Sequence, residues 1–475
     1  MTVQTEERTG RIARIALAMT AWSERWVPDA FIFALVATVI VVAAGVGATP
    51  STLTEVVDAW GRGFWELIPF TLQMALVIIT GHVLATSPPV GRLIRAAASR
   101  PRTPRQAVVL VTVFALLSSW INWGFSLVFS AVLAREVARR VAGVDYRALA
   151  AASFLGLGSI WAQGLSGSAA LQMASPDALP APIRDIVAAG GVVPGGMIPL
   201  SHTIFLWQSV FAVIVETIVV ATIMWFATPP ASRARTARDL GIDLAETQPV
   251  TGVDDRDRTP GTWLEHSSLL MWFTVLLGGT YLVRHFSTAP QPLNAITLNT
   301  LNLTFLLVGF LLHRTPARLM RAVQDATPAV WGVILQFPFY AGIAAIITTT
   351  TLNDVLANLF VSVSTPGTFP PLVALYSALL GVFVPSGGAK WVIEAPYVMK
   401  AAHGLQVHVG WVVSAYDLGE ALANLVQPFW MLPILGLFRL RARDIMGYTF
   451  LVCLGLAPVV FALLYLLGRT LSYPF

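Results

Sequence analysis

Residues 106–134, QAVVLVTVFALLSSWINWGFSLVFSAVLA, form an apolar run whose polar centre contains Asn122 and Gly124. The run could cross a bilayer as one tilted helix, since a crossing takes roughly 20 residues. Arginines lie on both sides of it, at 102 and 105 before and at 135, 139 and 140 after, and the positive-inside rule places both clusters in the cytoplasm. A re-entrant hairpin satisfies both observations, because irregular backbone is tolerated at membrane depth inside protein or beside a water-filled cavity.

The composition of the whole chain agrees with a membrane protein. Of its 475 residues, 56% are hydrophobic and only 12% are charged, against roughly 25% charged in soluble domains. This composition excludes a soluble enzyme, a disordered chain and a nucleic-acid binder. The net charge of +5 is spread over short clusters between apolar runs, where it sets topology. The one cysteine, Cys453, allows no intramolecular disulfide.

We therefore predict an all-α polytopic membrane protein with about nine crossings (range 9–11) and two re-entrant hairpins. The predicted parts are a cytoplasmic N-terminus (1–25), a first transmembrane repeat (26–228), a cytoplasmic linker (229–265), a connecting helix (266–284) and a second repeat (285–475). The basic clusters place the N-terminus inside. The predicted crossings lie near 30–47, 66–86, 148–173, 198–227, 266–283, 294–312, 329–350, 410–436 and 445–467.

An internal repeat underlies this division. A single offset of 263 residues relates Leu72-Gln73 to Leu335-Gln336, Leu155-Gly156 to Leu418-Gly419, and Gly124 to Gly387. The offset superposes the first hairpin on a second one near 370–397, which breaks at 385–388. The connecting helix reverses the direction of the second half, so the two repeats are predicted to be inverted. Inverted repeats with broken helices are typical of secondary transporters, whose binding site lies at the repeat interface.

The two hairpin tips are the first candidate binding groups. Asn122, Gly124 and Ser126 belong to the first tip, and Ser386, Gly387 and Gly388 belong to the second. Helix N-termini favour carboxylates, and helix C-terminal carbonyls favour cations. The alternative interpretation is tight helix packing, for which small residues are also used in membranes.

Two further breaks lie beside the hairpins. Residues 164–169, GLSGSA, end the third crossing, where an unwound half-helix would add Ser166 and Ser168 to the site. The corresponding stretch of the second half contains Asn424, Gln427 and Pro428, and a proline disfavours a continuous helix.

Buried charge supplies candidates for ion coupling. Asp417 and Glu420 share one helix face with Asn424, and a carboxylate at the bilayer centre costs roughly 2.5–3.5 kcal/mol on insertion scales. They could bind a coupling cation, relay a proton or pair with Lys390, which lies one helical turn before Glu394. A structural ion pair is the alternative.

Four other polar residues are predicted inside or near the membrane. Gln73 and Gln336, related by the repeat offset, either line the pathway or tie two helices together. Glu216 and His202 are additional intramembrane candidates, although a lone histidine near a helix end is usually interfacial.

An intramembrane serine protease is the alternative function. Residues 164–167, GLSG, match the pattern around the nucleophile of rhomboid-type proteases, with Ser166 as nucleophile and His202 as base. The pattern is short, and this function leaves the hairpins and the repeat unexplained. The sequence contains no Walker motif and no zinc spacing. We therefore expect that the protein is not an enzyme and has no catalytic residues, and that it binds no metal and no cofactor.

Many separate blocks resemble the bacterial short-chain fatty acid transporter family, the group of acetoacetate and butyrate uptake proteins. They are RWVPD (25–29), WGRGFW (60–65), QMAL (73–76), TGH (80–82), INWGF (121–125), AREVARRV (134–141), GLSGS (164–168), QFPFYAGI (336–343), VPSGG (384–388), WVI (391–393), QPFW (427–430) and RDIMGY (443–448). The resemblance implies uptake of short monocarboxylates across the bacterial cytoplasmic (inner) membrane by a domain that moves past a scaffold, often in a homodimer. Lys390, Glu394 and Asp417 depart from the family's usual uncharged or histidine residues, which leaves substrate length and coupling ion open.

Membrane energetics constrain the mechanism. Moving a monoanion inward against an inside-negative potential costs about 2.3 kcal/mol per 100 mV. Cotransport of the monoanion with one cation is electroneutral. Cotransport with two cations moves a net positive charge inward, so the membrane potential drives uptake. We therefore expect H+ or Na+ symport of a small monocarboxylate by alternating access, with the lipid bilayer and no nucleic acid as a partner.

Overall fold

The computed structural model describes residues 30–65, 68–174, 191–244, 259–289, 292–295, 298–352, 362–383 and 387–475, with isolated positions between and before them. Every regular element in these ranges is helical. The first part contains α2 (Ala30–Ala48), α3 (Leu53–Gly63), α4 (Ile68–Ala85), α5 (Pro88–Ala98), α6 (Pro104–Ile121), α7 (Trp123–Arg140), α8 (Tyr146–Leu155), α9 (Ser168–Ala174) and α11 (Trp207–Ala227).

The second part begins with two helices that follow the charged segment, α12 (Pro260–His266) and α13 (Leu269–Thr288). Further along are α14 (Leu298–His313), α15 (Pro316–Ala326), α16 (Trp331–Thr349), α18 (Phe369–Phe383), α19 (Gly387–Gly404), α20 (Val409–Asn424), α21 (Leu432–Phe438) and α22 (Ala442–Gly468). The all-helical prediction is confirmed for the described residues.

Local sequence explains where many of these helices begin. Thr52 and Glu55 form a capping box at the start of α3, and Thr103 caps α6 ahead of a proline at its first position. Asp145 caps α8 by accepting from the backbone N–H of Ala148 at 2.9 Å.

Four described helices are long and apolar enough to cross a bilayer, and three bent helix pairs raise the number to seven if each pair is one span. One of the four is α6, which ends at the turn of the first hairpin. The remaining apolar helices, Ala34–Ala48, Asn299–His313 and Phe369–Val382, are shorter. The chain is therefore multi-pass, with four to seven candidate spans among the described residues, and the nine crossings stay a prediction.

The helix bounds repeat along the chain. Each bound of α3, Leu53 and Gly63, recurs 263 residues later in α15, Pro316 and Ala326. The first residue of α4 recurs in α16 and that of α8 in α20 with the same offset, and the pairs α6/α18, α7/α19 and α9/α21 agree within two residues. The offset expected from scattered sequence identities thus also relates the helices.

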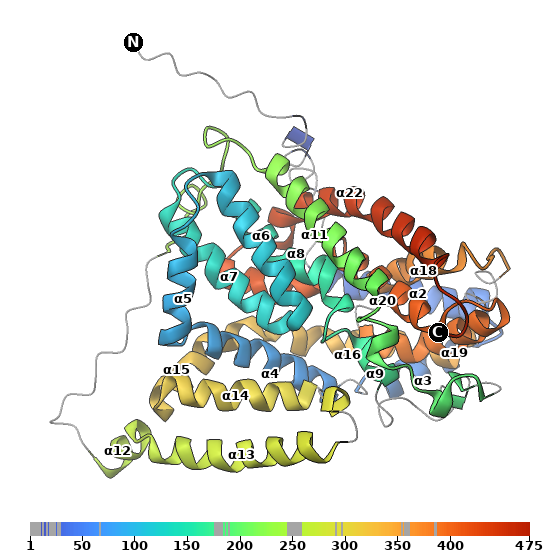
Figure 1. Cartoon of the computed structure of the whole chain (residues 1–475), viewed down its shortest axis with the longest axis horizontal. Helices are drawn as coiled ribbons and strands as arrows, with labels where there is room; N and C mark the ends of the chain where they lie inside the picture. The colour runs from blue at the N-terminus through green and yellow to red at the C-terminus, as the bar shows by residue number, and fades with distance from the viewer. Residues whose placement is uncertain are drawn as a thin grey trace.

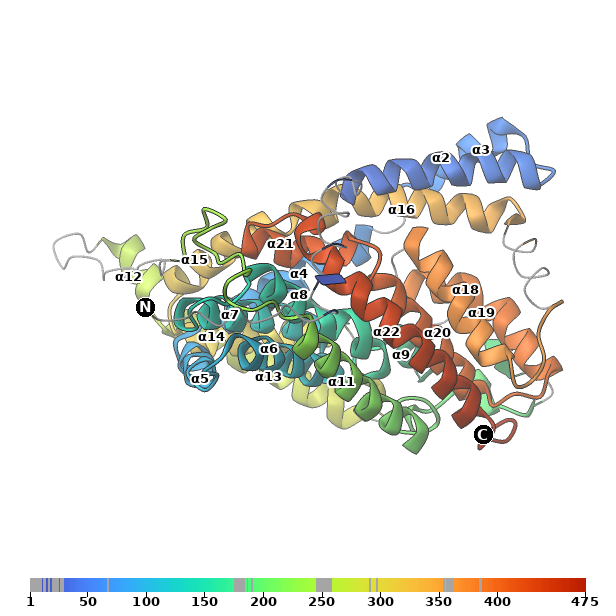
Figure 2. The same cartoon turned by 90° about the horizontal axis from the view of Figure 1, so that it is seen from above.

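Packing between helices repeats with the two halves exchanged. Helix α16 packs on α2 and α3, and its counterpart α4 packs on α14 and α15. Figure 2 shows α2 and α3 lying along α16, and Figure 1 shows α13, α14 and α4 side by side. Within each half, α6 packs on α8 and α18 packs on α20. The contacts of α6 with α8 and of α18 with α20 belong to a core that contains both hairpins.

The predicted linker, 229–265, is only partly separate from the helices. Residues 229–244 pack beside the end of the first hairpin and the start of α8. There the backbone N–H of Tyr146 donates to the carbonyl of Arg235 at 2.9 Å, and the backbone N–H of Arg235 donates to Asp145 Oδ2 at 3.0 Å. Residues 245–258 lie outside the described residues, and α12 follows them.

Candidate functional site

The first hairpin turns at Asn122, as its polar centre predicts. Asn122 has extended backbone angles, and its side-chain oxygen accepts from the backbone N–H of Phe125 at 2.8 Å, which caps α7. The limbs are joined by Ser126, whose hydroxyl donates to the carbonyl of Ala115 at 2.7 Å and accepts from Ser118 at 2.9 Å. A continuous helix would separate residues 115 and 126 by about 16 Å, so these bonds define a hairpin.

The helix that follows is broken, also as predicted. Helix α8 passes into a π-helical turn, Gly156–Ile160, then a 3-10 turn, Trp161–Gln163, and a non-helical stretch before α9. Glycines allow the hairpin to approach this segment: a Cβ on Gly156 would lie 2.2 Å from the carbonyl oxygen of Ala115, and one on Gly164 would lie 2.0 Å from that of Trp120.

The first hairpin tip and this broken helix meet directly. The backbone N–H of Trp123 donates to the hydroxyl oxygen of Ser166 at 3.0 Å, and the N–H of Leu165 donates to the carbonyl of Trp120 at 2.8 Å. Asn122, Ser126 and Ser166 are all at least 95% buried. Ser168 begins α9. Asn122, Ser126 and Ser166, three of the predicted polar groups of the first half, are therefore gathered in one buried place.

The second hairpin is formed by α18 and α19, with its tip partly outside the described residues. Ser386 is among residues 384–386 that are not described. The limbs are tied by the hydroxyl of Tyr397, which donates to that of Tyr376 at 2.8 Å. At the described end of the tip, the carbonyl of Gly387 accepts from the hydroxyl of Tyr416 at 2.5 Å, and the carbonyl of Gly388 accepts from Gln172 of α9 at 3.0 Å.

A fully buried charge cluster lies between α18, α19 and α20. The Lys390 ammonium is 3.0 Å from Glu394 Oε1 and 2.9 Å from Glu420 Oε2, and it donates to the carbonyl of Ser377 at 2.9 Å. The ring of Tyr416 is 4.4 Å from the same nitrogen. One cation thus faces two carboxylates. Gly381 leaves room for Glu420, since a Cβ there would lie 3.1 Å from its Oε2.

Asp417, on the same helix as Glu420, points toward the first half. Its carboxylate faces the backbone N–H groups of Ala169 and Ala170, in the first turn of α9, while its Oδ1 has no hydrogen-bond partner among the described residues. A carboxylate is favourable there because the first N–H groups of a helix have no intrahelical partner. The two predicted coupling residues consequently differ: Glu420 has an ionic partner, and Asp417 has backbone donors.

Other contacts join the broken helices of the two halves. Asn424 donates from Nδ2 to the carbonyl of Leu157, within the π-helical turn, at 3.2 Å. The second break separates α20 from Phe429–Phe438 with a bend of 70°. The rings of Trp123 and Trp430 lie 5.2 Å apart, one at the first hairpin tip and one just past that break. Most of the predicted site residues therefore lie along one interface.

The two glutamines related by the repeat have different surroundings. Gln73 Nε2 donates to Asn299 Oδ1 at 2.9 Å, and the backbone carbonyl of Gln73 accepts from Asn302 Nδ2 at 3.0 Å. Gln73 therefore ties α4 to α14. Gln336 is fully buried in α16, and its amide has no hydrogen-bond partner within the described part of the chain. Gln427 donates to the hydroxyl of Tyr340 at 3.3 Å, which joins the second break to α16.

Glu216 emerges as a site residue that the sequence only weakly indicated. It is fully buried in α11 and accepts from Gln163 Nε2 at 2.8 Å. Gln163 lies in the 3-10 turn of the broken helix. A glutamate in the middle of an apolar run was the available signal, but its partner is 53 positions away and carries no charge.

The Ser166–His202 pair required by the protease alternative is not formed. Ser166 accepts from Trp123, whereas the ring of His202 contacts that of Phe475 at a tilt of 38° with 4.3 Å between centroids, and lies 6.2 Å from that of His408. His202 is thus part of an aromatic cluster at the beginning of α20.

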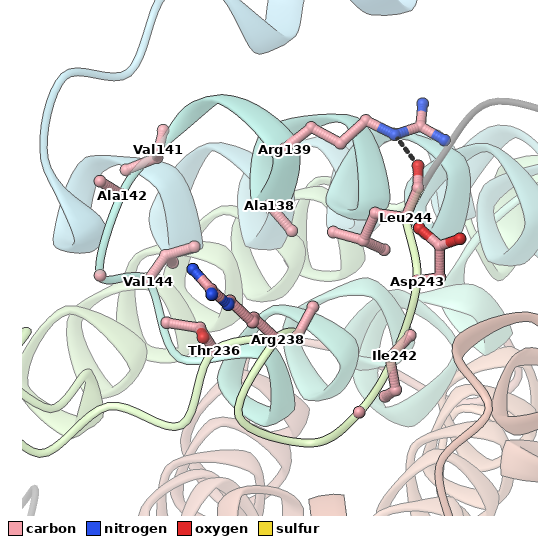
Figure 3. Close-up of a pocket in the computed structure, with 13 residues that line it drawn as sticks. Ala138, Arg139, Val141, Ala142, Val144, Thr236, Arg238, Ile242, Asp243 and Leu244 are labelled. Carbon is pink, nitrogen blue, oxygen red and sulfur yellow. Dashed lines mark hydrogen bonds between the residues drawn. The ribbon is translucent and has the colours of Figure 1, made fainter.

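A surface hollow of about 780 Å³ lies away from these residues, between the end of α7 and residues 236–244 (Figure 3). Arg139 crosses it and donates to the carbonyl of Leu244, while Glu136 binds both Arg139 and Arg140 at 2.7 Å. The bond from Arg139 ties Leu244 of the charged segment to the first hairpin, and Glu136 holds Arg139 and Arg140 within α7. The hollow is shallow and exposed, so we assign the candidate site to the buried interface instead.

Two hairpins, two broken helices and buried charge within an apolar helical protein define a membrane transporter. The family model for short chain fatty acid transporters matches residues 11–467. The chain belongs to the short-chain fatty acid transporter family, which confirms the resemblance noted from the sequence, and it is therefore a transporter and not an enzyme.

Relatives in two bacteria match almost end to end. A protein of Escherichia coli (strain K12), named as a short-chain fatty acid transporter, is 40% identical over 95% of this chain and 99% of its own length. A protein of Haemophilus influenzae with the same name is 36% identical over 96% of this chain and 100% of its own length. The solved structure of the Alcanivorax borkumensis YdaH transporter aligns with 92% of this chain and 98% of its own, at 15% identity and a TM-score of 0.45.

Proposed function

We propose that this protein is a secondary active symporter that takes up short-chain monocarboxylates, such as butyrate or acetoacetate, together with H+ or Na+. The observation that carries the proposal is the hydrogen bond from Asn424 to Leu157, which brings the broken helices of the two halves together at the hairpin tips. Sites at repeat interfaces formed by broken helices are where secondary transporters bind substrate and coupling ion.

The substrate carboxylate binds at the hairpin tips and at the serines of the broken helix. Ser166 accepts from Trp123, so its hydroxyl hydrogen is available to a carboxylate oxygen. Asn122, Gly124, Ser126, Ser168, Ser386, Gly387, Gly388 and Asn424 complete the proposed binding set. The aromatic rings of Trp123 and Trp430 lie beside it and would contact the short alkyl chain.

Buried carboxylates provide the coupling. Lys390, Glu394 and Glu420 carry a net charge of −1 when all are ionised, and Asp417 adds another negative charge close by. Burying uncompensated charge is costly, so this group favours binding of a further cation. We assign the coupling ion, H+ or Na+, to Asp417 and Glu420.

Inverted repeats provide the alternating access. The recurring helix bounds and exchanged packing support two repeats related by a pseudo-two-fold axis, with the hairpins re-entering the membrane from opposite sides. We place the protein in the bacterial inner membrane with its N-terminus inside and nine crossings, and we propose a homodimer as the functional assembly.

Exchange in proteoliposomes tests the substrate class. Vesicles loaded with unlabelled butyrate should take up labelled butyrate faster than protein-free vesicles, and excess acetoacetate should compete while a dicarboxylate should not. Protein-free vesicles are essential because the neutral acid crosses lipid unaided. Exchange no faster than this control for both monocarboxylates would reject the proposed substrate class.

A further inference from the structure

Glu216 occupies an unusual position for an acidic residue. It lies near the middle of α11 (Trp207–Ala227), one of the helices long and apolar enough to cross a bilayer, and it is fully buried among protein atoms. An ionised carboxylate at this depth is strongly unfavourable without a counter-charge. Its hydrogen-bond partner is Gln163, a neutral amide.

The hydrogen bonds of this pair are incomplete for an ionised carboxylate. Gln163 Nε2 donates to Glu216 Oε1 at 2.8 Å, while Glu216 Oε2 and Gln163 Oε1 are both buried without a partner among the described residues. Both of these atoms are acceptors when Glu216 is ionised. A proton on Oε2 supplies the missing donor, because a carboxylic acid and an amide can bond reciprocally.

No charged side chain faces Glu216 from the helices packed on α11, which are α6, α8 with its π-helical turn, and α22. The π-helical turn, GLGSI, and residues 106–121 of α6 contain no titratable residue. The titratable residues of α8, Tyr146 and Arg147, lie at its opposite end, and Arg147 pairs with Asp145 at 3.3 Å.

Helix α22 runs antiparallel to α11, which sets what lies level with Glu216. Gln208 donates to Thr470 at 3.0 Å, and a Cβ on Gly455 would lie 2.6 Å from Ile223. This register places Glu216 near Ala462, among apolar residues. Tyr465 is the nearest titratable residue of α22 in that register and is 38% exposed, while Cys453, Asp444 and Arg443 lie further along.

From this geometry we infer that Glu216 carries a coupling proton, bound on Oε2 and donated to Gln163 Oε1, in addition to the cation assigned to Asp417 and Glu420. The inference rests on the proposed function and deepens it by naming H+ as a coupling ion and Glu216 as a coupling residue distinct from the Lys390 cluster. Glu420 has an ammonium 2.9 Å away, whereas the hydrogen-bond partner of Glu216 among the described residues is the neutral amide of Gln163.

The same pair connects the proton to the substrate site. Gln163 lies three residues before Ser166 on the unwound segment. When the proton passes from Oε2 to water, Gln163 Oε1 loses its donor and only the bond from Nε2 to Oε1 remains, so the orientation of Gln163 on this segment is less restrained. Protonation at Glu216 thereby orders the segment that presents Ser166 to the substrate.

Infrared spectroscopy tests the protonation without any transport. Purified wild type at neutral pH should show the carbonyl band of protonated carboxylic acid, and Glu216→Gln should lose the part of this band that Glu216 contributes. The amide of this variant reproduces both hydrogen bonds of the protonated pair, so its thermal midpoint should equal that of wild type. Glu265→Gln, an exposed change in α12, is the matched control. An unchanged band in Glu216→Gln would overturn the inference.

Transport measurements test the coupling. Under an imposed pH gradient, Glu216→Gln should lose accumulation of labelled butyrate but keep its exchange at equilibrium, because exchange needs no net proton movement. Accumulation equal to wild type, or loss of exchange along with accumulation, would contradict the assignment. If wild-type protein moved no monocarboxylate at all, the proposed substrate would be wrong, while the infrared result would still decide the protonation.

Discussion

Asn424 of α20 donates to the backbone carbonyl of Leu157 of the π-helical turn at 3.2 Å, so a side chain of one half completes the broken helix of the other. A π-helical turn leaves irregular carbonyl groups, and a buried carbonyl needs a donor. Close beside this bond, a Cβ on Gly158 would lie 2.5 Å from Leu425. Any relative movement of the halves during transport must exchange these contacts.

Replacing Asn424 by alanine should therefore lower stability. The change leaves the Leu157 carbonyl buried without a donor, which costs about 1–3 kcal/mol. Thermal denaturation in detergent should show a lower midpoint than for Thr274→Ala, an exposed change on α13. Equal midpoints for the two variants would show that the carbonyl finds another partner.

Gly164→Ala should separate the first hairpin tip from the broken helix. The new Cβ would lie 2.0 Å from the carbonyl oxygen of Trp120, and overpacking of this kind typically costs about 1–3 kcal/mol. Gly279→Ala is the control, because a Cβ there meets nothing within 4 Å. We expect a lowered midpoint and slow butyrate exchange for the first variant alone. Wild-type behaviour of Gly164→Ala would refute the close approach.

Lys390→Met should lower the stability of the protein more than removal of all three charges of the cluster does. The single change leaves Glu394 and Glu420 buried without their cation, and breaking a buried ion pair costs about 3–5 kcal/mol. Adding Glu394→Gln and Glu420→Gln removes the uncompensated charge, so the triple variant should recover much of the lost stability.

The comparison needs the yield of folded protein and the thermal midpoint of both variants. A triple variant as unstable as Lys390→Met would mean that the ammonium acts through packing and not through charge.

Two buried serines separate binding from structure. Ser166→Ala removes the hydroxyl proposed to donate to the substrate carboxylate, and hydrogen bonds to charged groups contribute about 1.5–3 kcal/mol. The half-saturating butyrate concentration in exchange should therefore rise roughly 10- to 100-fold. Ser118→Ala should instead lower the thermal midpoint, because its hydroxyl donates to that of Ser126 across the hairpin limbs. Equal half-saturating concentrations in both variants would place the substrate elsewhere.

The main turns of the fold could be predicted from the sequence because each has a strong local signal. Arginines on both sides of one apolar run indicate the hairpin at Asn122, and closely spaced glycines and serines indicate the break at 164–167. Helices α3 and α15 were missed because they are short and amphipathic, although their bounds obey the 263-residue offset.

The site was less predictable because its partners come from distant segments. Pairing of Lys390 with Glu420 was one of several alternatives, and only the crossing of α19 and α20 selects it. Capping of α9 by Asp417 depends on backbone groups, which carry no sequence signal. Glu216 lies outside both hairpins, so its place beside Gln163 required the packing of α11 on the broken helix.

Cation-driven accumulation of labelled butyrate by proteoliposomes is the decisive measurement of symport. With an imposed inward gradient of H+ or of Na+, we expect accumulation above protein-free vesicles, and the proton carried by Glu216 predicts it for the H+ gradient. Equal levels in vesicles with and without protein, under both gradients, would contradict cation-coupled transport of short monocarboxylates.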